Sequence, residues 1–320
     1  MIDLKSKFLG AMLGSALGDA IGELAFRLPE REILLARLES VPDLTYTDDT
    51  AMAVGLAESI LEKGGVEQQD LGETFRRNFR REPWRGYAAG PPTIFAIVEN
   101  HGLTYKEAAR SLFRGKGSFG NGAAMRIAPL GLFLHSSPDL YEQARASAET
   151  THAHIVGSDG AAVQAAAVAE AVKSDPRGPF SPHEFIGKLE SFARTPEIRR
   201  KMALIEQLLG GNADPAAAAR ELGQSVAVHE SMPFALFSFV RHPRSFEDCL
   251  CCAILNGGDR DTLGAMACAV SGAYLGAEAL PPAWAEKLEN RGYIESLAVK
   301  LAEISKSKQG AGSQENRSNR

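Results

Sequence analysis

Four glycines recur at every fourth position near the start of the chain, at Gly10, Gly14, Gly18 and Gly22. On an α-helix this spacing places all four on one face. Each glycine in a helix costs about 1 kcal/mol relative to alanine, so a stripe of them indicates that another backbone packs very close to this face. The segment 8–21 is otherwise mostly apolar and contains a single acidic residue, Asp19. The sequence therefore predicts a buried central helix.

The rest of the chain also has the pattern of helices. Alanine is abundant, β-branched runs are few, and no Asn-Gly or Asp-Gly pair separates alternating strands. Ser181-Pro182 and Ser245 are typical of helix starts, and the Gly64-Gly65 pair is typical of a helix end. We predict helices over 51–63, 198–209, 123–134 and 263–276, with an irregular surface excursion over 77–92. The predicted fold is all-α, one domain over 1–304, followed by a polar, disordered tail over 305–320.

Composition limits the kinds of partner and the compartment. The 320 residues carry a net charge of −5, so no general nucleic-acid binding is expected. The apolar stretch 8–21 is too short for a membrane span, and no secretory signal is evident. The chain has four cysteines, three of them within 249–252, which is neither a disulfide framework nor a paired zinc motif. Buried thiols and a cytoplasmic location are expected.

Two clusters of oxygen-bearing side chains precede predicted helices. The first is Thr47-Asp48-Asp49-Thr50, and the second is Asp259-Arg260-Asp261-Thr262 after Gly257-Gly258. Taken singly, each is explained by helix capping. Taken together, they are hard oxygen ligands of the kind that Mg²⁺ and Mn²⁺ prefer. Four aspartates in one place would repel one another unless cations neutralised them.

Two further motifs could contribute to a ligand site. The run 115–122 is rich in glycine and precedes a predicted helix, an arrangement that suits a pyrophosphate but also occurs in plain linkers. It is not a P-loop, because no Lys-Ser or Lys-Thr pair follows its last glycine. Thr151-His152-Ala153-His154 contains an HxH pair without an evident third zinc ligand, so capping or packing is the expected role.

The ordered set of motifs resembles the ADP-ribosylglycohydrolase family, which includes the dinitrogenase-reductase-activating glycohydrolase. The motifs follow the family order and span about 8–280. They are Gly18-Asp19-Ala20-Ile21-Gly22, Thr47-Asp48-Asp49-Thr50, Gly120-Asn121-Gly122-Ala123-Ala124-Met125-Arg126, Thr151-His152 and Gly257-Gly258-Asp259-Arg260-Asp261-Thr262.

The resemblance implies an all-α, orthogonal helical bundle with a central buried helix and a binuclear metal site holding two divalent cations, Mg²⁺ or Mn²⁺. The implied metal ligands are Thr47, Asp48, Asp49, Asp259, Asp261 and Thr262, with Asp261 as the bridge. The implied substrate-binding residues are Gly117, Ser118, Phe119, Gly120, Asn121 and Gly122, which cradle the diphosphate with Phe119 near the adenosine, and His152, which lines the pocket.

One position departs from the family pattern. Family members commonly carry a glutamate seven residues after the aspartate of the first motif, and this chain has Phe26 there. The nearest carboxylate is Glu23, with Glu30 farther along. We predict Asp48, Asp49 and Glu23 as the catalytic residues: Asp48 or Asp49 lies nearest the attacking water, and Glu23 is an additional acid or base.

The expected function is metal-dependent hydrolysis of the N- or O-glycosidic bond that joins ADP-ribose to a modified acceptor, with an arginine-linked acceptor favoured by the resemblance. The substrate would be an ADP-ribosylated protein, small molecule or nucleic acid. Two alternatives stay open at this point: a non-catalytic ADP-ribose-binding protein, and a di-metal hydrolase of the same fold that acts on another ribosyl or nucleotide compound.

Overall fold

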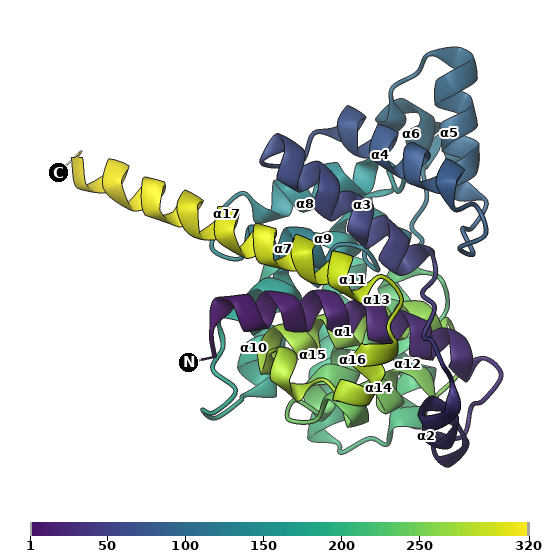
Figure 1. The fold of residues 1–320 in the computed structure, drawn as a ribbon, viewed down its shortest axis with the longest axis vertical. Helices are drawn as coiled ribbons and strands as arrows, with labels where there is room; N and C mark the ends of the chain where they lie inside the picture. Colours follow the sequence, from purple (N-terminus) through teal and green to yellow (C-terminus); the bar gives the residue numbers. More distant parts are fainter. Residues whose placement is uncertain (1, 319–320) are drawn as a thin grey trace.

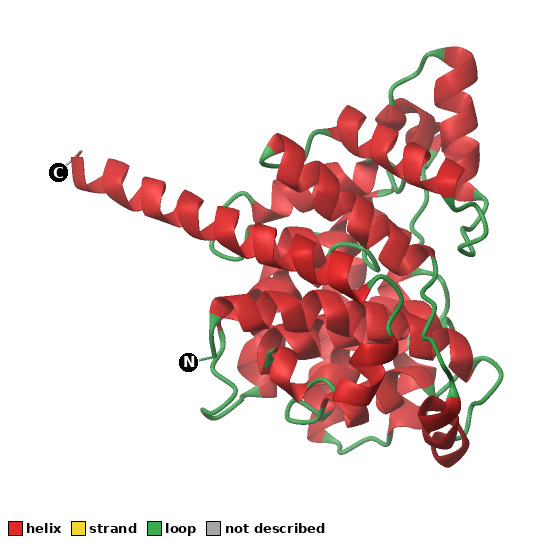
Figure 2. Ribbon diagram, in the orientation of Figure 1, coloured by secondary structure: helices red, strands yellow, loops and turns green. Residues whose placement is uncertain are grey.

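A computed structural model describes residues 2–318 of the chain. Within this range the chain folds into helices joined by loops, without a β-strand, which confirms the predicted all-α class (Figure 2). The α-helices are α1 (Leu4–Ala25), α2 (Arg31–Ser40), α3 (Asp48–Lys63), α4 (Gln68–Arg81), α5 (Gly90–His101), α6 (Tyr105–Gly115), α7 (Ala128–Phe133), α8 (Leu140–Glu149), α9 (Ile155–Lys173), α10 (Pro182–Phe192), α11 (Pro196–Gly210), α12 (Pro215–Leu222), α13 (Val228–Arg241), α14 (Phe246–Ile254), α15 (Arg260–Leu275), α16 (Pro282–Lys287) and α17 (Arg291–Ser318). Two short 3₁₀ turns are η1 (Asn121–Ala123) and η2 (Ala277–Ala279).

Helix α1 crosses the middle of the molecule and packs along α15, with α17 beside it (Figure 1). Nearly all of its residues from Ser6 to Gly22 are buried. The glycine stripe lies against the α15 backbone: a Cβ atom on Gly14 would stand 2.6 Å from the carbonyl oxygen of Cys268, and one on Gly18 would collide with the Gly264 carbonyl. The predicted close approach of a second backbone is therefore confirmed.

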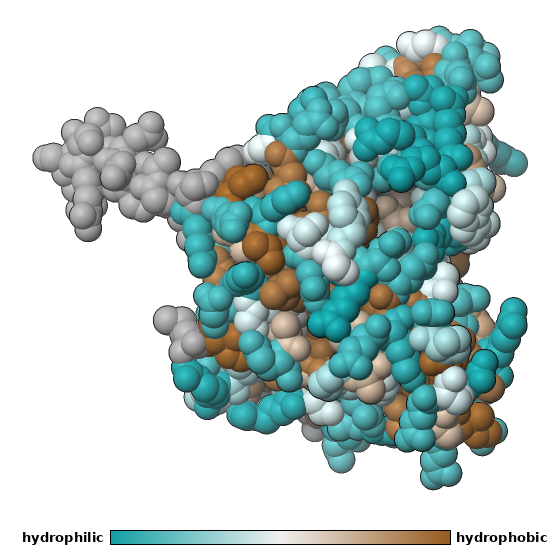
Figure 3. All heavy atoms as spheres, in the orientation of Figure 1, coloured by the Kyte–Doolittle hydropathy of each residue, from teal (hydrophilic) through white to brown (hydrophobic). Residues whose placement is uncertain are grey.

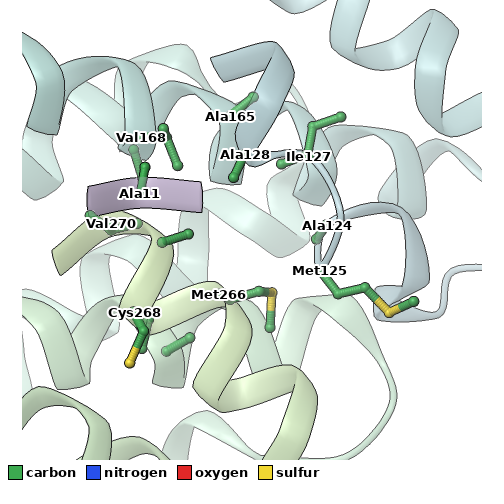
Figure 4. Close-up of a cluster of buried hydrophobic side chains, with 14 of the residues drawn as sticks. Ala11, Ala124, Met125, Ile127, Ala128, Ala165, Val168, Met266, Cys268 and Val270 are labelled. Atoms are coloured by element: carbon green, nitrogen blue, oxygen red, sulfur yellow. The ribbon is translucent and has the colours of Figure 1, made fainter. Parts of the chain in front are cut away.

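Apolar side chains of α1, α7, α9 and α15 form the core around this contact. Figure 4 shows Ala11 of α1 beside Val168 of α9 and Val270 of α15. Small side chains dominate here because the helices lie so close together. Helices α1 and α9 are long and apolar enough to cross a bilayer by length and composition, but most of their residues are buried inside this core.

Helices α4, α5 and α6 project from the core (Figure 1), and their visible surface is largely hydrophilic, whereas apolar side chains show near α17 (Figure 3). The predicted irregular excursion over 77–92 is partly wrong, because α4 continues to Arg81 and α5 begins at Gly90. Only 82–89 forms a loop. Likewise, the predicted helix over 123–134 is divided into η1 and α7, with Pro129 in the first turn of α7.

Several predicted helix ends are confirmed. The hydroxyl of Ser181 accepts a hydrogen bond from the Glu184 amide, and Ser245 accepts one from the Asp248 amide. Gly64 ends α3 in a left-handed conformation at φ 69°, which suits glycine. The four cysteines are free and buried, as expected.

Helix α17 runs across most of 305–320, the stretch for which composition predicts a disordered tail. Ser305 is still buried, and its hydroxyl donates a hydrogen bond to the Phe133 carbonyl at 3.1 Å. The predicted domain limit thus falls inside a helix. Residues 319–320 lie outside the described residues.

Candidate active site

Asp19 of α1 holds the start of α3. Its carboxylate is fully buried and accepts hydrogen bonds from the amide and hydroxyl of Thr47, at 3.0 and 2.8 Å, and from the amide and hydroxyl of Thr50, at 3.0 and 2.5 Å. Thr47 is the N-cap of α3, and Asp48 and Asp49 form its first turn. A single aspartate therefore fixes the position of the first acidic cluster.

Gly22 brings the second acidic cluster to the same end of α1. A Cβ atom at Gly22 would stand 2.5 Å from the carbonyl oxygen of Arg260 and 2.6 Å from the Cα of Asp261. The start of α15 therefore lies directly on α1, one helical turn from Asp19. The two clusters, about two hundred residues apart in the sequence, are placed together because both helices begin at this end of α1.

The electrostatics of the carboxylates reflect this proximity. Burial, followed by the charges of Asp261, Asp19 and other aspartates, raises the pKa of Asp49 well above its usual range. Burial and the charge of Asp19 raise the pKa of Asp48 to about 7. Burial and the charge of Asp259 raise the pKa of Asp261 to about 8. Each of these carboxylates therefore opposes ionisation of its neighbours.

The bonding of the individual oxygens separates capping from other roles. Thr47 caps α3, but Asp259, at the N-cap position of α15, makes no capping hydrogen bond with its side chain. Its Oδ2 instead accepts a hydrogen bond from Asn121 Nδ2 at 2.7 Å. Oδ1 of Asp49 is buried and has no hydrogen-bond partner. Capping thus explains Thr47 but leaves Asp49 and Asp259 unexplained.

The donor set fits divalent cations of the hard, oxygen-binding class. It supplies four carboxylates that repel one another, together with Thr47 and Thr262 at the two helix starts. A buried carboxylate oxygen without a partner, such as Asp49 Oδ1, is an available ligand. Among the described residues, however, no three His, Cys, Asp or Glu side chains already converge in a metal-holding arrangement.

The glycine-rich loop lies beside the second cluster. Asn121 links the two. Its side chain donates a hydrogen bond to Asp259, and its backbone N–H donates one to the Val226 carbonyl at 2.9 Å. Phe119 accepts a backbone hydrogen bond from Val228 at 3.1 Å, and Ser118 accepts one from His154 at 3.2 Å. The loop is thus held between the start of α9 and the start of α13.

Phe119 is the most exposed aromatic group of the loop, at 46 % exposure. Its ring lies 5.3 Å from the ring of His154 and 5.8 Å from that of His229, measured between centroids. His154 also caps α9, as expected, because its Nδ1 accepts a hydrogen bond from the Val156 amide. A half-exposed ring in contact with two imidazoles is a suitable surface for a planar, aromatic ligand group.

His152 lies under the loop. Its side chain is buried, and Cβ atoms on Gly120 and Gly122 would stand 3.4 and 3.0 Å from its Nε2. Gly122 is required here, because a Cβ atom would also stand 2.8 Å from Cε1 of the imidazole, whereas a Cβ atom on Gly120 would be in ordinary contact with the ring. Gly117 has φ 72° and packs against the backbone of 153–154, so it too must be glycine.

Glu23 and Phe26 lie at the exposed end of α1. Glu23 follows Gly22, which touches the start of α15, and its side chain is exposed. Phe26 is the C-cap of α1 and is 48 % exposed. The structure thus places Glu23 directly after Gly22, where α1 meets the start of α15, and its catalytic role stays a prediction.

Sequence reasoning assigned no structural role to three residues that organise the site. Asp19 belongs to the first family motif, but the sequence did not predict that it holds the start of α3; its place directly after a stripe glycine is the signal that could have indicated this. Arg85 is buried, donates to the Tyr46 carbonyl at 3.0 Å and pairs with Glu289 at 2.7 Å, so it steadies the residue before Thr47. Arg126 is also fully buried.

Comparisons with known proteins relate the chain to one family. The model of the ADP-ribosylglycohydrolase family matches residues 1–311. ADP-ribosylhydrolase ARH3 of Homo sapiens is 34 % identical over 292 residues, covering 83 % of this chain and 80 % of the relative. An uncharacterized protein of Archaeoglobus fulgidus is 32 % identical over 272 residues, covering 81 % and 80 %. A solved structure described as an ADP-ribosylglycohydrolase-related protein complex matches with a TM-score of 0.74 and 28 % identity, covering 95 % of this chain and all of that one.

The family model and these relatives define the chain as a glycosyl hydrolase. The chain belongs to the ADP-ribosylglycohydrolase family, as the motifs of the sequence predicted.

Proposed function

We propose that this protein removes ADP-ribose from a modified acceptor by metal-dependent hydrolysis of the glycosidic bond at the ribose. The observation that carries the proposal is the partnerless, buried Oδ1 of Asp49 among three further aspartates at two adjoining helix starts. Leaving such an oxygen unpaired is costly unless a ligand satisfies it. Family membership supplies the ADP-ribosyl chemistry.

Six side chains would hold two divalent cations, Mg²⁺ or Mn²⁺: Thr47, Asp48, Asp49, Asp259, Asp261 and Thr262. When bound, such cations orient oxygen ligands and lower the pKa of water. The buried carboxylate of Asp19 keeps Thr47 and the first turn of α3 in place. Asn121 orients Asp259 through its Nδ2 hydrogen bond.

The chain's own residues would divide the remaining tasks. Residues 117–122 would receive the diphosphate, with Phe119 against the adenine. Asp48 or Asp49 would accept the proton of the attacking water and stabilise positive charge that develops on the ribose, since glycoside cleavage passes through an oxocarbenium-like state. Glu23 is the proposed acid or base toward the leaving group, in place of the glutamate that Phe26 replaces.

The arginine-linked acceptor is the specific substrate that we propose, because the family resemblance favours it. We also propose a cytoplasmic location, in keeping with four unpaired cysteines. Neither property follows from the geometry of the clusters alone.

The test is a panel of arginine-, serine- and nucleic-acid-linked ADP-ribose substrates, each assayed with Mn²⁺, with Mg²⁺ and with a chelator. We expect release of free ADP-ribose with a cation and loss of release with the chelator. Asp261→Ala should abolish turnover and keep the circular-dichroism spectrum, whereas Asp43→Ala, at an exposed loop position, should behave as wild type. Full activity of Asp261→Ala would refute the metal mechanism.

The same panel separates the alternatives. Tight ADP-ribose binding without release from any substrate would identify a non-catalytic reader. Release of product only from other ribosyl or nucleotide compounds would identify a hydrolase of the same fold with a different substrate.

A further inference from the structure

Arg126 is a buried cation that forms no ion pair among the described residues, although the charge of Asp48 acts on it. Its side chain is fully buried, and no carboxylate lies within ion-pair distance of it among the described side chains. The guanidinium lies 4.5 Å from the ring centre of Phe75, and Nη1 approaches Met52 Sδ at 3.7 Å. Burial lowers its pKa to about 9, which still leaves it charged at neutral pH. Burying an unpaired charge lowers the free energy of unfolding, and the hydrogen bonds of Arg126 indicate a role other than packing.

The strongest hydrogen bond of Arg126 goes to a threonine hydroxyl. Nη2 donates to Oγ1 of Thr151 at 2.7 Å and more weakly to the Ser147 carbonyl at 3.4 Å. A guanidinium has only donors, so Thr151 Oγ1 must be the acceptor in this bond. The hydroxyl hydrogen is therefore free to point elsewhere.

Only one acceptor for that hydrogen lies within reach among the described residues. Thr151 Oγ1 stands 2.8 Å from Nδ1 of the neighbouring His152. If Nδ1 carried a proton and donated instead, the buried hydroxyl hydrogen would have no acceptor, at a cost of about 1–3 kcal/mol. In the favoured arrangement the guanidinium donates a hydrogen bond to the Thr151 hydroxyl, and this hydroxyl donates one to Nδ1 of His152. We call these two hydrogen bonds the relay. They leave the imidazole proton on Nε2.

We propose that Arg126, acting through Thr151, is a positioning residue that fixes His152 as the neutral Nε2–H tautomer, so that the ring donates a hydrogen bond to an acceptor oxygen of the ligand at the glycine loop. Nε2 is the ring atom nearest Gly120 and among the nearest to Gly122, and it has no hydrogen-bond partner among the described residues. The acceptor is a ribose or phosphate oxygen of ADP-ribose, and this identity rests on the proposed function.

Protonation of the ring does not compete with this arrangement. Burial, together with the charge of Arg126, lowers the pKa of His152 to about 3. The imidazole is thus neutral at working pH, with one nitrogen that accepts and one that donates. Without the hydrogen bonds from Arg126 to Thr151 and from Thr151 to Nδ1, both neutral tautomers of His152 would be populated. In the Nδ1–H tautomer, Nε2 would present a lone pair to the ligand instead of a proton.

The test is nitrogen NMR of the full chain labelled with ¹⁵N-histidine, with the His152 signals assigned by their loss in His152→Asn. We expect wild type to show protonated Nε2 and unprotonated Nδ1. Thr151→Val removes the hydroxyl and should give mixed tautomers and weaker ADP-ribose binding, by about twofold if the two tautomers become equally populated, whereas Thr151→Ser should match wild type. Thr150→Val is the matched control, because Thr150 is equally buried and its hydroxyl bonds only the Ala146 carbonyl.

Wild-type protein with a protonated Nδ1 at His152 would overturn the proposal by itself, so the test survives if Thr151→Val fails to fold. An unchanged tautomer and affinity in folded Thr151→Val would also overturn it. The NMR spectra report the tautomer directly and do not depend on enzymatic activity. Failure of the proposed function would appear as absent ADP-ribose release with the tautomer intact, while failure of the relay would leave wild-type release unaffected.

Discussion

Asp48→Asn measures how strongly the acidic clusters oppose folding when no cation is present. Asp48 is buried, and its pKa rises from 3.8 to about 7. Between these pH values the folded chain holds a proton that the unfolded chain has lost, so stability falls as pH rises through this window. A pKa rise of about three corresponds to roughly 4 kcal/mol, at about 1.4 kcal/mol for each tenfold step.

Asparagine has nearly the same shape and stays neutral at every pH. In chelator-treated protein, we therefore expect the stability of Asp48→Asn relative to wild type to increase by about 3 kcal/mol between pH 5 and pH 8. The assay is urea unfolding at both pH values. The variant should at the same time lose ADP-ribose release, so that stability and activity change in opposite directions.

Divalent cations should narrow this difference in stability. Mn²⁺ at a hundred times its dissociation constant should stabilise wild type by about 2.7 kcal/mol and the variant by less. Asp43→Asn, at an exposed position, is the control and should show neither effect. If Asp48→Asn is no more stable than wild type at pH 8 without cations, Asp48 does not have the raised pKa that its burial and the charge of Asp19 imply.

Three further predictions concern the scaffold and the loop. Gly18→Ala should lower the free energy of unfolding by at least about 2 kcal/mol in urea unfolding, because the added methyl group would collide with the Gly264 carbonyl. Gly292→Ala is the control: open space surrounds Gly292, so this variant should be as stable as wild type or more stable. Phe119→Ala should weaken ADP-ribose binding about tenfold in calorimetry, since it removes the exposed ring. Asn121→Ala should reduce release more than binding if its main task is to orient Asp259, and equal losses in both would assign it to the ligand instead.

Local signals predicted the helices well. The spacing of the stripe glycines correctly implied a second backbone, because only steric contact at every turn explains four helical glycines. Ser181 and Ser245 were correctly predicted as helix starts, because each hydroxyl bonds an amide only three residues farther along the chain. The motif order was specific enough to identify the family.

Properties that depend on long-range contacts could not be predicted in this way. Local composition does not reveal that the loop 82–89 approaches the first cluster, where a Cβ atom on Gly86 would stand 3.9 Å from Asp48 Oδ1. Burial of Arg85 and Arg126 is equally hidden, since arginine is usually exposed. The capping interpretation is confirmed for Thr47 but not for the Asp259 side chain, which bonds Asn121 instead of an amide of α15. The sequence of the two clusters does not reveal this difference.

The glycines of α1 and α15 allow the two helices to pack closely, but they do not fix the position of one helix along the other. Gly10, Gly14, Gly18 and Gly22 face a partner series that also repeats every fourth residue, with small residues at 264, 268, 272 and 276. A slide of one helix by four residues, about 6 Å, would again bring small residues face to face. Asp19 removes this degeneracy, because the slide would carry its carboxylate away from Thr47 and Thr50. One buried acid therefore selects among otherwise equivalent alignments, and the alignment it selects is the one in which the two acidic helix starts meet.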